Sequence, residues 1–184
     1  KFEGVIPNTE RRFRETDSEY QKNELAKEQF LAVRKTLQLE DPSYKIRYDD
    51  SGKPFINSDL NISISHSKFM AAIVFSENNK AGIDIEHKEN KIINIQNKFL
   101  NDSEKLENEY QYNVDYLTMI WTAKESIYKA LGIKGISFSD NIVIKNIKKN
   151  KGHGYYINGK EKYKFDLIFF SIEEYILCYA QSNN

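Results

Sequence analysis

Hydrophobic positions in the first part of the chain recur at the spacing of an α-helix. From residue 17 to about residue 39, apolar side chains return at helical intervals, which predicts one long amphipathic helix. Asp17 or Ser18 can cap its first turn, and Pro42 prevents it from continuing. The apolar stripe that we expect to be buried consists of Ala26, Phe30, Val33 and Leu37.

The pattern then changes to the alternation that is typical of strands. Short polar turns separate the alternating runs, and the last three runs are joined by brief connections, so we expect those three to form an antiparallel meander. The predicted strands cover residues 44–48, 53–56, 61–65, 69–76 and 81–86.

Helical spacing returns after residue 88 and ends at Gly132, where a left-handed residue can close a helix. Three helices fit this region: one marked by Ile92, Ile95 and Phe99, one capped by Asp102 or Ser103, and a long one capped by Asp115. The last part alternates again, with a hairpin signal at Asn158-Gly159. Its predicted strands cover residues 141–147, 155–157, 162–170 and 175–181.

This order of elements, helix then strands and again helices then strands, predicts an α+β protein of two similar lobes related by a pseudo-twofold axis. Each lobe would combine helix with an antiparallel sheet, residues 1–86 forming the N-terminal lobe and residues 87–184 the C-terminal lobe. No linker rich in Pro, Gly or Ser separates the two halves, so we expect the lobes to pack tightly.

Composition narrows the classes of function. The 27 basic residues balance the 27 acidic ones, so no overall field favours nucleic acid or an anionic membrane. No apolar run in the sequence is long enough to span a bilayer. We therefore expect neither kind of partner. The single cysteine, Cys178, excludes an internal disulfide and fits a reducing, cytoplasmic setting.

Two carboxylates stand on one face of the predicted strand at residues 81–86. Asp84 and Glu86 are two positions apart, so their side chains project to the same side about 6–7 Å apart. The simplest interpretation is a solvated strand face, but two like charges repel unless a cation lies between them. Oxygen ligands of this kind favour Mg²⁺ or Mn²⁺, and a third carboxylate such as Glu125 would strengthen the site.

Glu125 lies on the long predicted helix with Lys129 one turn further on the same face. Taken alone, this is an ordinary ion pair that stabilises a helix by about 0.2–0.5 kcal/mol. The surrounding side chains are largely apolar, so the pair should lie at the edge of a core or in a cleft.

Two further positions fit phosphate binding. Ser65 and His66 stand in a short turn where hydroxyl, imidazole and backbone N–H groups can hold a phosphate, although such turns are often only structural. Lys53 is held between a glycine and a proline, and it is either a point charge for a phosphate or a solvated loop lysine.

Four stretches in one order carry a resemblance to a known family. They are Gly52-Lys-Pro54, Ser63-Ile-Ser-His-Ser67, Gly82-Ile-Asp-Ile-Glu86 and Trp121-Thr-Ala-Lys-Glu-Ser-Ile-Tyr-Lys129. From about Glu24 to Ser139 the chain resembles the 4'-phosphopantetheinyl transferase superfamily, in its larger, two-lobed and monomeric, surfactin-synthetase-activating branch. Members of that branch normally have a strand ahead of the stretch that begins here at Lys1, so we expect this sequence to be truncated.

The resemblance implies that coenzyme A is bound between the lobes and that Mg²⁺ is the cofactor. By position, it gives Asp84, Glu86 and Glu125 as the Mg²⁺ ligands, with Asp84 also counted in the coenzyme A site. Glu125 would accept a proton from the substrate serine, and Lys129 would face the pyrophosphate.

The same resemblance implies that Lys53, Ser65 and His66 hold the region of the adenosine 3'-phosphate. Glu104 takes the place of an acidic residue that is a further candidate for a catalytic base. The basic residues that help to bind coenzyme A near the N-terminus are not firmly placed, and the candidates are Arg12, Lys22 and Lys27.

The implied reaction moves 4'-phosphopantetheine from coenzyme A to a serine of an apo acyl or peptidyl carrier protein and releases adenosine 3',5'-bisphosphate. A helix with Ile92, Ile95 and Phe99 flanked by Lys91 and Lys98 is a candidate for carrier docking, unless its apolar residues belong to the core. The alternatives are a non-catalytic module that binds coenzyme A or carrier protein and, with a looser fit, a Mg²⁺-dependent nuclease.

Overall fold

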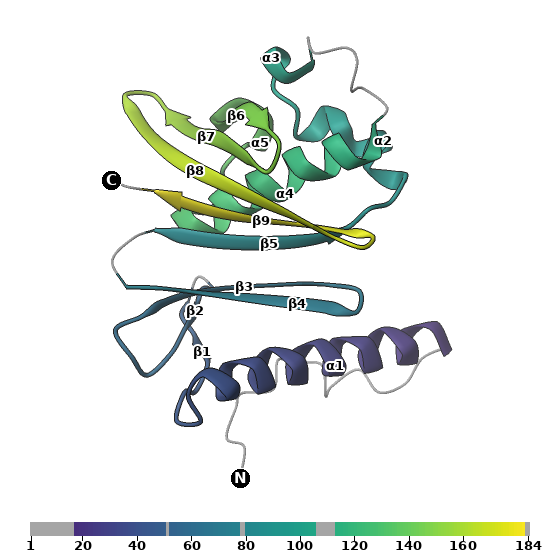
Figure 1. Ribbon diagram of the computed structural model, residues 1–184, viewed down its shortest axis with the longest axis vertical. Coiled ribbons are helices and arrows are strands. Elements are labelled where there is room, and N and C mark those ends of the chain that lie inside the picture. The colour runs from purple at the N-terminus through teal and green to yellow at the C-terminus, as the bar shows by residue number, and fades with distance from the viewer. Residues whose placement is uncertain (1–16, 51, 78–79, 106–112, 183–184) are drawn as a thin grey trace.

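Two antiparallel sheets lie next to each other between the two long helices; the first helix lies on the outside, whereas the second is covered in turn by short helices and by strands of the curved second sheet (Figure 1). The computed structural model describes residues 17–50, 52–77, 80–105 and 113–182, with side chains from residue 24 onward. The N-terminal unit consists of α1 and the first sheet, and the C-terminal unit consists of the second sheet and the remaining helices. Among the described residues, no helix is both long and apolar enough to cross a membrane.

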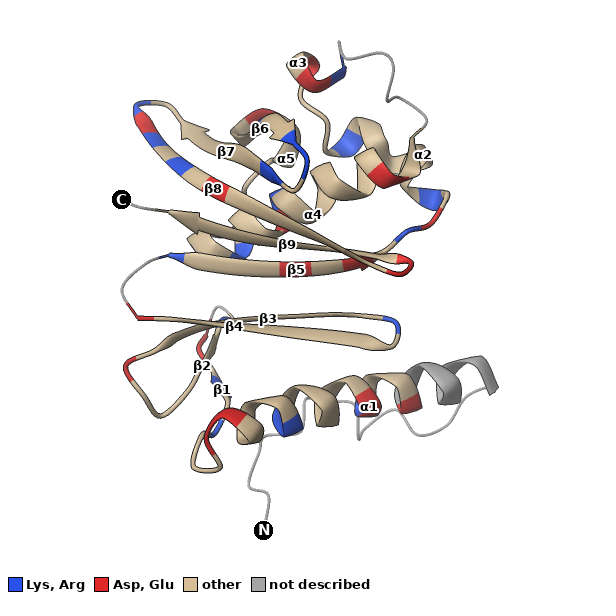
Figure 2. Ribbon diagram, viewed as in Figure 1, with Lys and Arg blue, Asp and Glu red and all other residues tan. Residues whose placement is uncertain are grey.

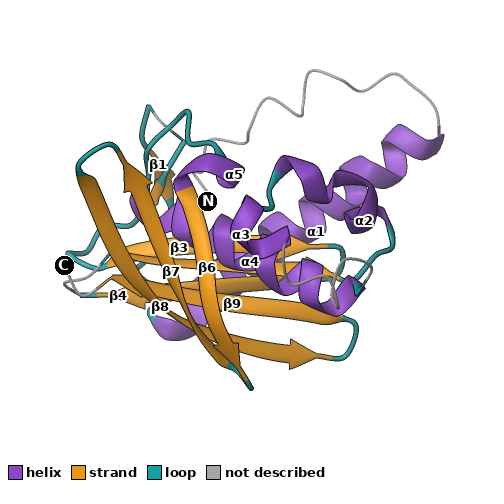
Figure 3. Ribbon diagram, turned by 90° about the horizontal axis from the view of Figure 1, so that it is seen from above, coloured by secondary structure: helices purple, strands orange, loops and turns teal. Residues whose placement is uncertain are grey.

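The first sheet has the strand order β1-β2-β3-β4, and the second has the order β5-β9-β8-β7-β6. The helices are α1 (Asp17–Glu40), α2 (Lys91–Ile95), α3 (Asp102–Lys105), α4 (Val114–Leu131) and α5 (Phe138–Asn141), with a 3-10 turn at Gln96–Lys98. The strands are β1 (Arg47–Tyr48), β2 (Pro54–Phe55), β3 (Asn61–Ser67), β4 (Met70–Ser76), β5 (Ala81–His87), β6 (Ile142–Lys148), β7 (Lys151–Asn158), β8 (Glu161–Ile172) and β9 (Tyr175–Ser182). Figure 3 shows β6, β7 and β8 crossing β3 and β4 obliquely.

The α+β class, the two antiparallel sheets and the two long helices are confirmed. Helix α1 has the predicted extent, with Val33 and Leu37 buried in the N-terminal core. Helix α4 ends at Gly132 in the left-handed conformation, with φ of 65°. Its N-cap is Asn113, whose side chain accepts the Tyr116 N–H, and Asp115 lies inside the first turn, so the predicted cap was wrong.

The expected meander of three strands is wrong at its last strand. β3 pairs with β4 as predicted, but β5 pairs with β9 and forms an edge of the second sheet. By strand pairing, the change of sheet therefore falls between β4 and β5 and not at residue 86. The division of the chain into two folding domains remains a prediction.

A glycine lets α4 approach β5 closely. A Cβ added at Gly82 would overlap the Ser126 carbonyl oxygen and would lie 2.7 Å from the Ala130 backbone nitrogen. Any side chain at residue 82 would therefore push α4 away from the strand. This close contact fixes the distance between the carboxylates of β5 and the polar side chains of α4.

The proposed docking helix is mainly part of the core. Ile92 and Phe99 are buried in the C-terminal cluster, and Ile95 packs against the same cluster. Of the residues named for docking, the flanking lysines are the exposed ones, and Lys91 pairs with Glu89 at 2.7 Å. The apolar positions are explained by folding, so this helix is not retained as a docking surface.

Candidate functional site

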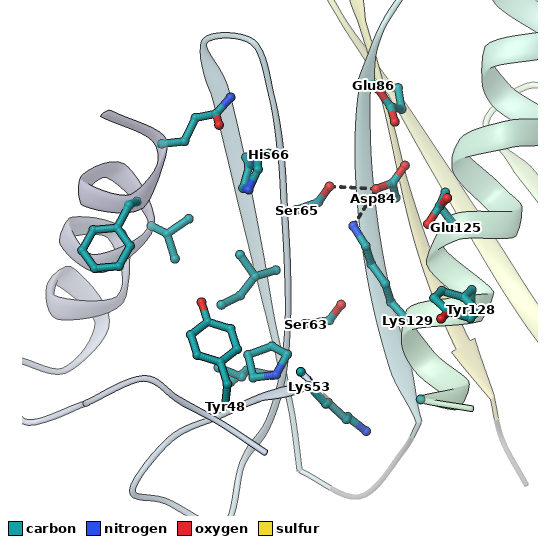
Figure 4. A pocket seen from close by; sticks show the side chains of 18 of the residues that line it. Tyr48, Lys53, Ser63, Ser65, His66, Asp84, Glu86, Glu125, Tyr128 and Lys129 are labelled. Atoms are coloured by element: carbon teal, nitrogen blue, oxygen red, sulfur yellow. Dashed lines mark hydrogen bonds and ion pairs between the residues drawn. The ribbon is translucent and has the colours of Figure 1, made fainter. Parts of the chain in front are cut away.

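A cavity of about 640 Å³ lies where the N-terminal and C-terminal units meet. Side chains from α1, β3, β5 and α4 line it, so that segments far apart in the sequence contribute to one site (Figure 4). Of the expected site residues, the cavity brings together Lys53, Ser65, His66, Asp84, Glu86, Glu125 and Lys129. Two acidic positions on β5 stand out on a strand that is otherwise mostly uncharged (Figure 2).

Asp84 is the most enclosed of these carboxylates, with 3% of its surface exposed. Its Oδ1 accepts hydrogen bonds from Lys129 Nζ and Ser65 Oγ, both at 2.7 Å. Its Oδ2 is buried and accepts no hydrogen bond from the described residues. Burial raises the pKa of Asp84, and the charge of Lys129 opposes that shift.

Glu86 is held by two neutral donors. Trp121 Nε1 donates to Oε1 at 3.1 Å, and Ser67 Oγ donates to Oε2 at 3.2 Å. Burial raises the pKa of Glu86, and the nearby charge of Asp84 raises it further. The two carboxylates of β5 therefore repel one another, as their spacing predicted.

Glu125 extends from α4 toward Asp84 (Figure 4). Burial is the main cause that raises its pKa to about 7, and the charges of Asp84 and Glu86 add to the effect, while Lys129 opposes it. Both α4 and β5 belong to the C-terminal unit, so these side chains meet within one unit rather than across the junction. Lys129, expected mainly to face a phosphate, also neutralises Asp84.

Alternate serines of β3 join the first sheet to this acidic strand. Ser63, Ser65 and Ser67 accept the backbone N–H groups of Ile83, Ile85 and His87 at 3.1, 3.2 and 3.1 Å. Because β5 is an edge strand, these outward N–H groups have no strand partner on that side. The same hydroxyls of Ser65 and Ser67 then donate to the carboxylates, so one row of serines both joins the units and orients the acids.

Lys53 and His66 lie on the N-terminal side of the cavity. The end of the Lys53 side chain reaches the C-terminus of α4, with Nζ 3.5 Å from the place where a Cβ on Gly132 would stand. Partial burial lowers the pKa of His66, and Lys129 lowers it further. At neutral pH His66 would therefore offer a phosphate a neutral N–H donor rather than a positive charge.

Glu104 does not line the cavity, and its surroundings contradict a role as catalytic base. It is 5% exposed, and its Oε2 pairs with Lys124 Nζ at 2.7 Å while Oε1 accepts the Ile144 N–H at 2.7 Å. A carboxylate with both oxygens occupied inside the core, away from the cavity, is better explained by a structural role than by proton transfer to a substrate. Glu104 is buried there because it pairs with Lys124, a residue to which the sequence analysis assigned no role.

Several cavity residues were missed from the sequence. Phe30 and Arg34 are one helical turn apart on α1, and Arg34 lies over the Phe30 ring at 3.2 Å. Tyr48 and Tyr128 also line the cavity. Of the basic residues named near the N-terminus, Lys27 is exposed and pairs with Glu24 at 2.9 Å. Arg12 lies outside the described residues, as does the side chain of Lys22.

The donor chemistry of the site fits a hard divalent cation. Carboxylates from β5 and α4 face one cavity, burial and then the charge of Asp84 raise the pKa values of Glu86 and Glu125, and a buried oxygen of Asp84 lacks a partner among the described residues. In the described part of the chain, no three His, Cys, Asp or Glu side chains are already gathered at ligand distances. The Asp84–Lys129 ion pair occupies one of the oxygens concerned.

Comparison with known proteins points to one family. The model of the 4'-phosphopantetheinyl transferase superfamily matches residues 80–180, a span that contains Asp84, Glu86, Glu125 and Lys129. A model of the UvrA DNA-binding domain matches residues 1–27, most of which lie outside the described residues, and it carries no argument here.

The chain is also similar to a curated protein, 4'-phosphopantetheinyl transferase gsp of Aneurinibacillus migulanus. The two are 33% identical over 109 residues, which cover 55% of this chain and 46% of that protein. The chain thus spans about half the length of this relative. The family expected from the four sequence stretches is confirmed.

Proposed function

The chain belongs to the 4'-phosphopantetheinyl transferase superfamily, and we propose that it transfers 4'-phosphopantetheine from coenzyme A to a serine of an apo acyl or peptidyl carrier protein. Adenosine 3',5'-bisphosphate would be the second product. The observation that carries the proposal is the grouping of Asp84, Glu86 and Glu125 with Lys129 in one cavity between the units.

Asp84, Glu86 and Glu125 would hold Mg²⁺. When bound there, Mg²⁺ would supply positive charge for the pyrophosphate oxygens of coenzyme A. Asp84 offers the buried Oδ2 that accepts no hydrogen bond from the described residues, and the carboxylate of Glu86 forms no ion pair with a lysine among those residues.

Lys129 would stabilise the charge of the leaving group, and Glu125 would accept the proton of the attacking serine. Lys129 Nζ, now on Asp84 Oδ1 at 2.7 Å, would turn toward the pyrophosphate and stabilise the charge that develops on the leaving group. Glu125, which lines the same cavity, would take the proton from the carrier serine hydroxyl as a general base.

The N-terminal unit would bind the nucleotide end of coenzyme A. Lys53 would attract the 3'-phosphate by its charge. His66 would complete that region by hydrogen bonding, and Ser65 would do so if its hydroxyl turned away from Asp84. Lys53 already stands against the C-terminus of α4, so it can reach a ligand that lies between the units.

We further propose that the two units are related by a pseudo-twofold axis, because each packs one long helix on an antiparallel sheet. We also propose that the protein acts as a monomer, since one chain supplies every carboxylate and lysine in the scheme. The single cysteine, buried and without a disulfide, is compatible with action in the cytoplasm.

The test is incubation with coenzyme A, Mg²⁺ and an apo carrier protein, followed by mass measurement of the carrier. We expect Asp84→Ala and Glu125→Gln to reduce holo-carrier formation by ~10²-fold or more at fixed Mg²⁺. Glu161→Gln removes a charge from the exposed first residue of β8, outside the cavity, and serves as the matched control.

Each alternative has its own signature in this assay. Binding of coenzyme A without a mass gain would support a non-catalytic module, and nicking of plasmid DNA would support a nuclease. Transfer at the native rate by either carboxylate variant would refute the assignment of these residues.

A further inference from the structure

The Glu86 carboxylate accepts hydrogen bonds from both units of the fold. Trp121 on α4 donates to one oxygen at 3.1 Å, and Ser67 on β3 donates to the other at 3.2 Å. A glutamate side chain has three rotatable bonds, so a single hydrogen bond would leave the carboxylate free to turn. Two donors on different oxygens fix both its position and its plane.

The two donors are themselves held in place. The Trp121 ring meets Phe99 at 5.3 Å between centroids and Phe138 at 5.5 Å, and Phe99 is fully buried. An indole N–H can only donate, so its role toward Glu86 is fixed. Ser67 Oγ accepts the His87 N–H at 3.1 Å, which leaves its own proton for Glu86.

Neutral donors have a different effect from a charged one. Lys129 neutralises Asp84, whereas the indole and the hydroxyl leave the charge of Glu86 intact. Each carboxylate oxygen also keeps a lone pair that a cation can use. Glu86 is therefore the acid in the cavity that is both oriented and not ion-paired to a lysine among the described residues.

We propose that Trp121 and Ser67 are positioning residues that orient Glu86 toward a divalent cation held in the cavity. The proposal rests on the proposed function, because it takes the carboxylates as the cation site. Contacts of this kind, made to a ligand and not to the metal, change metal affinity by about 10–100-fold when they are removed.

The competing explanation is that Trp121 fills the core and Ser67 only joins the sheets. Trp121→Phe separates these roles, because it keeps an aromatic ring against Phe99 and Phe138 but removes the N–H. Ser67→Ala removes the hydroxyl alone. Ser63→Ala is the matched control, since Ser63 joins β5 in the same way but donates no hydrogen bond to a carboxylate among the described residues.

The measurement is direct titration with Mn²⁺ in the presence of coenzyme A, with free Mn²⁺ followed by electron paramagnetic resonance. We expect Trp121→Phe and Ser67→Ala each to raise the Kd for Mn²⁺ about 10-fold or more. Ser63→Ala should leave that Kd within about twofold of the native value. Unfolding by urea shows whether each variant is folded before its affinity is compared.

A double-mutant comparison tests the route through Glu86. If Trp121 acts by orienting Glu86, then Trp121→Phe should have no further effect on Mn²⁺ affinity in a Glu86→Gln background. Equal losses in both backgrounds would show that the ring acts on the site in another way and would overturn the proposal.

Trp121 also gives a second readout, because it is the chain's one tryptophan. Mg²⁺ added with coenzyme A should change the indole emission of the native protein, and Glu86→Gln should abolish that change. An unaltered emission at saturating Mg²⁺, or native Mn²⁺ affinity in folded Trp121→Phe, would refute the positioning role.

The outcomes also separate this inference from the proposed function. If the native protein transfers phosphopantetheine but Trp121→Phe and Ser67→Ala leave the Mn²⁺ affinity unchanged, the proposed function stands and the positioning role is refuted. A native protein that binds no Mn²⁺ with coenzyme A overturns the inference directly, and the mass assay then decides the function separately.

Discussion

Lys124 offers a sharp test of the structural account of Glu104. Its ammonium is fully buried and has four acceptors: Phe99 O at 2.6 Å, Glu104 Oε2 at 2.7 Å, Ile142 O at 2.7 Å and Phe138 O at 3.0 Å. These acceptors belong to segments that surround α4, so one side chain ties them to the helix.

Replacing Lys124 by Met keeps most of the apolar stem and removes the charge. Glu104 would remain buried without its cation, and breaking such a pair costs about 3–5 kcal/mol. The three carbonyl oxygens would also lose a donor, which can add about 1 kcal/mol or more for each that water cannot reach. We therefore expect Lys124→Met to lower the free energy of unfolding by about 5 kcal/mol. Because domains are stable by only about 5–15 kcal/mol, a loss of this size is enough to unfold a domain at the lower end of that range.

The assay is urea unfolding followed by circular dichroism, with Glu104→Gln and the double variant beside Lys124→Met. Glu104→Gln keeps an oxygen for the Ile144 N–H and should cost less than Lys124→Met. The double variant should be more stable than Lys124→Met, because no buried charge is left alone. A cost below about 1 kcal/mol for Lys124→Met would refute the reasoning. So would a fully stable Glu104→Gln that loses transfer as severely as Glu125→Gln.

Three further predictions test other parts of the site. Gly82→Ala should lower the free energy of unfolding by about 3 kcal/mol or more and also impair transfer, because its Cβ would meet the backbone of α4; a native melting temperature would contradict this. Glu125 has a folded pKa of about 7 against the ordinary 4.5, so in EDTA stability should fall by up to about 3 kcal/mol as pH rises from about 4.5 to 7. In urea unfolding experiments across this pH range, the free energy of unfolding of Glu125→Gln should fall less with rising pH than that of the native protein. Equal pH dependence in the two proteins would show that Glu125 does not have a raised pKa in the folded state. Lys53→Gln should weaken coenzyme A binding about tenfold by calorimetry and spare the KM for the carrier, whereas an unchanged Kd would place the 3'-phosphate elsewhere.

The sequence predicted those parts of the fold that depend on local spacing. Helix α1 and the C-terminus of α4 follow from apolar periodicity and from a glycine in the left-handed conformation. The partner of β5 could not be predicted in this way. Its apolar positions, Ile83 and Ile85, alternate equally well against either sheet, and only the distant strand β9 decides between them.

The candidate site shows the same division. Spacing on one strand and one helix puts Asp84 with Glu86 and Glu125 with Lys129 on common faces, and the resemblance to the family gave these four residues their predicted roles. The pairing of Glu104 with Lys124 was missed because Lys124 comes from another helix, although Lys124 beside Ala123 on a largely apolar helix was a usable signal for a buried lysine. The sequence did not distinguish Arg34 and Tyr48 from other polar residues in the same part of the chain, so their place in the cavity could not be predicted.

The serines of β3 explain why the change of sheet and the chemistry of the site depend on each other. If β5 had continued the meander, its N–H groups would pair with β4, and Ser63, Ser65 and Ser67 would face other partners. Because β5 instead forms the edge of the second sheet, its free N–H groups meet these three hydroxyls, and two of the hydroxyls reach Asp84 and Glu86. The contacts from Lys129 and Trp121 remain within the C-terminal unit, but the serine contacts to the two acids exist only when the units are docked. A change that separates the units, even one far from the carboxylates, should weaken cation binding before it unfolds either unit.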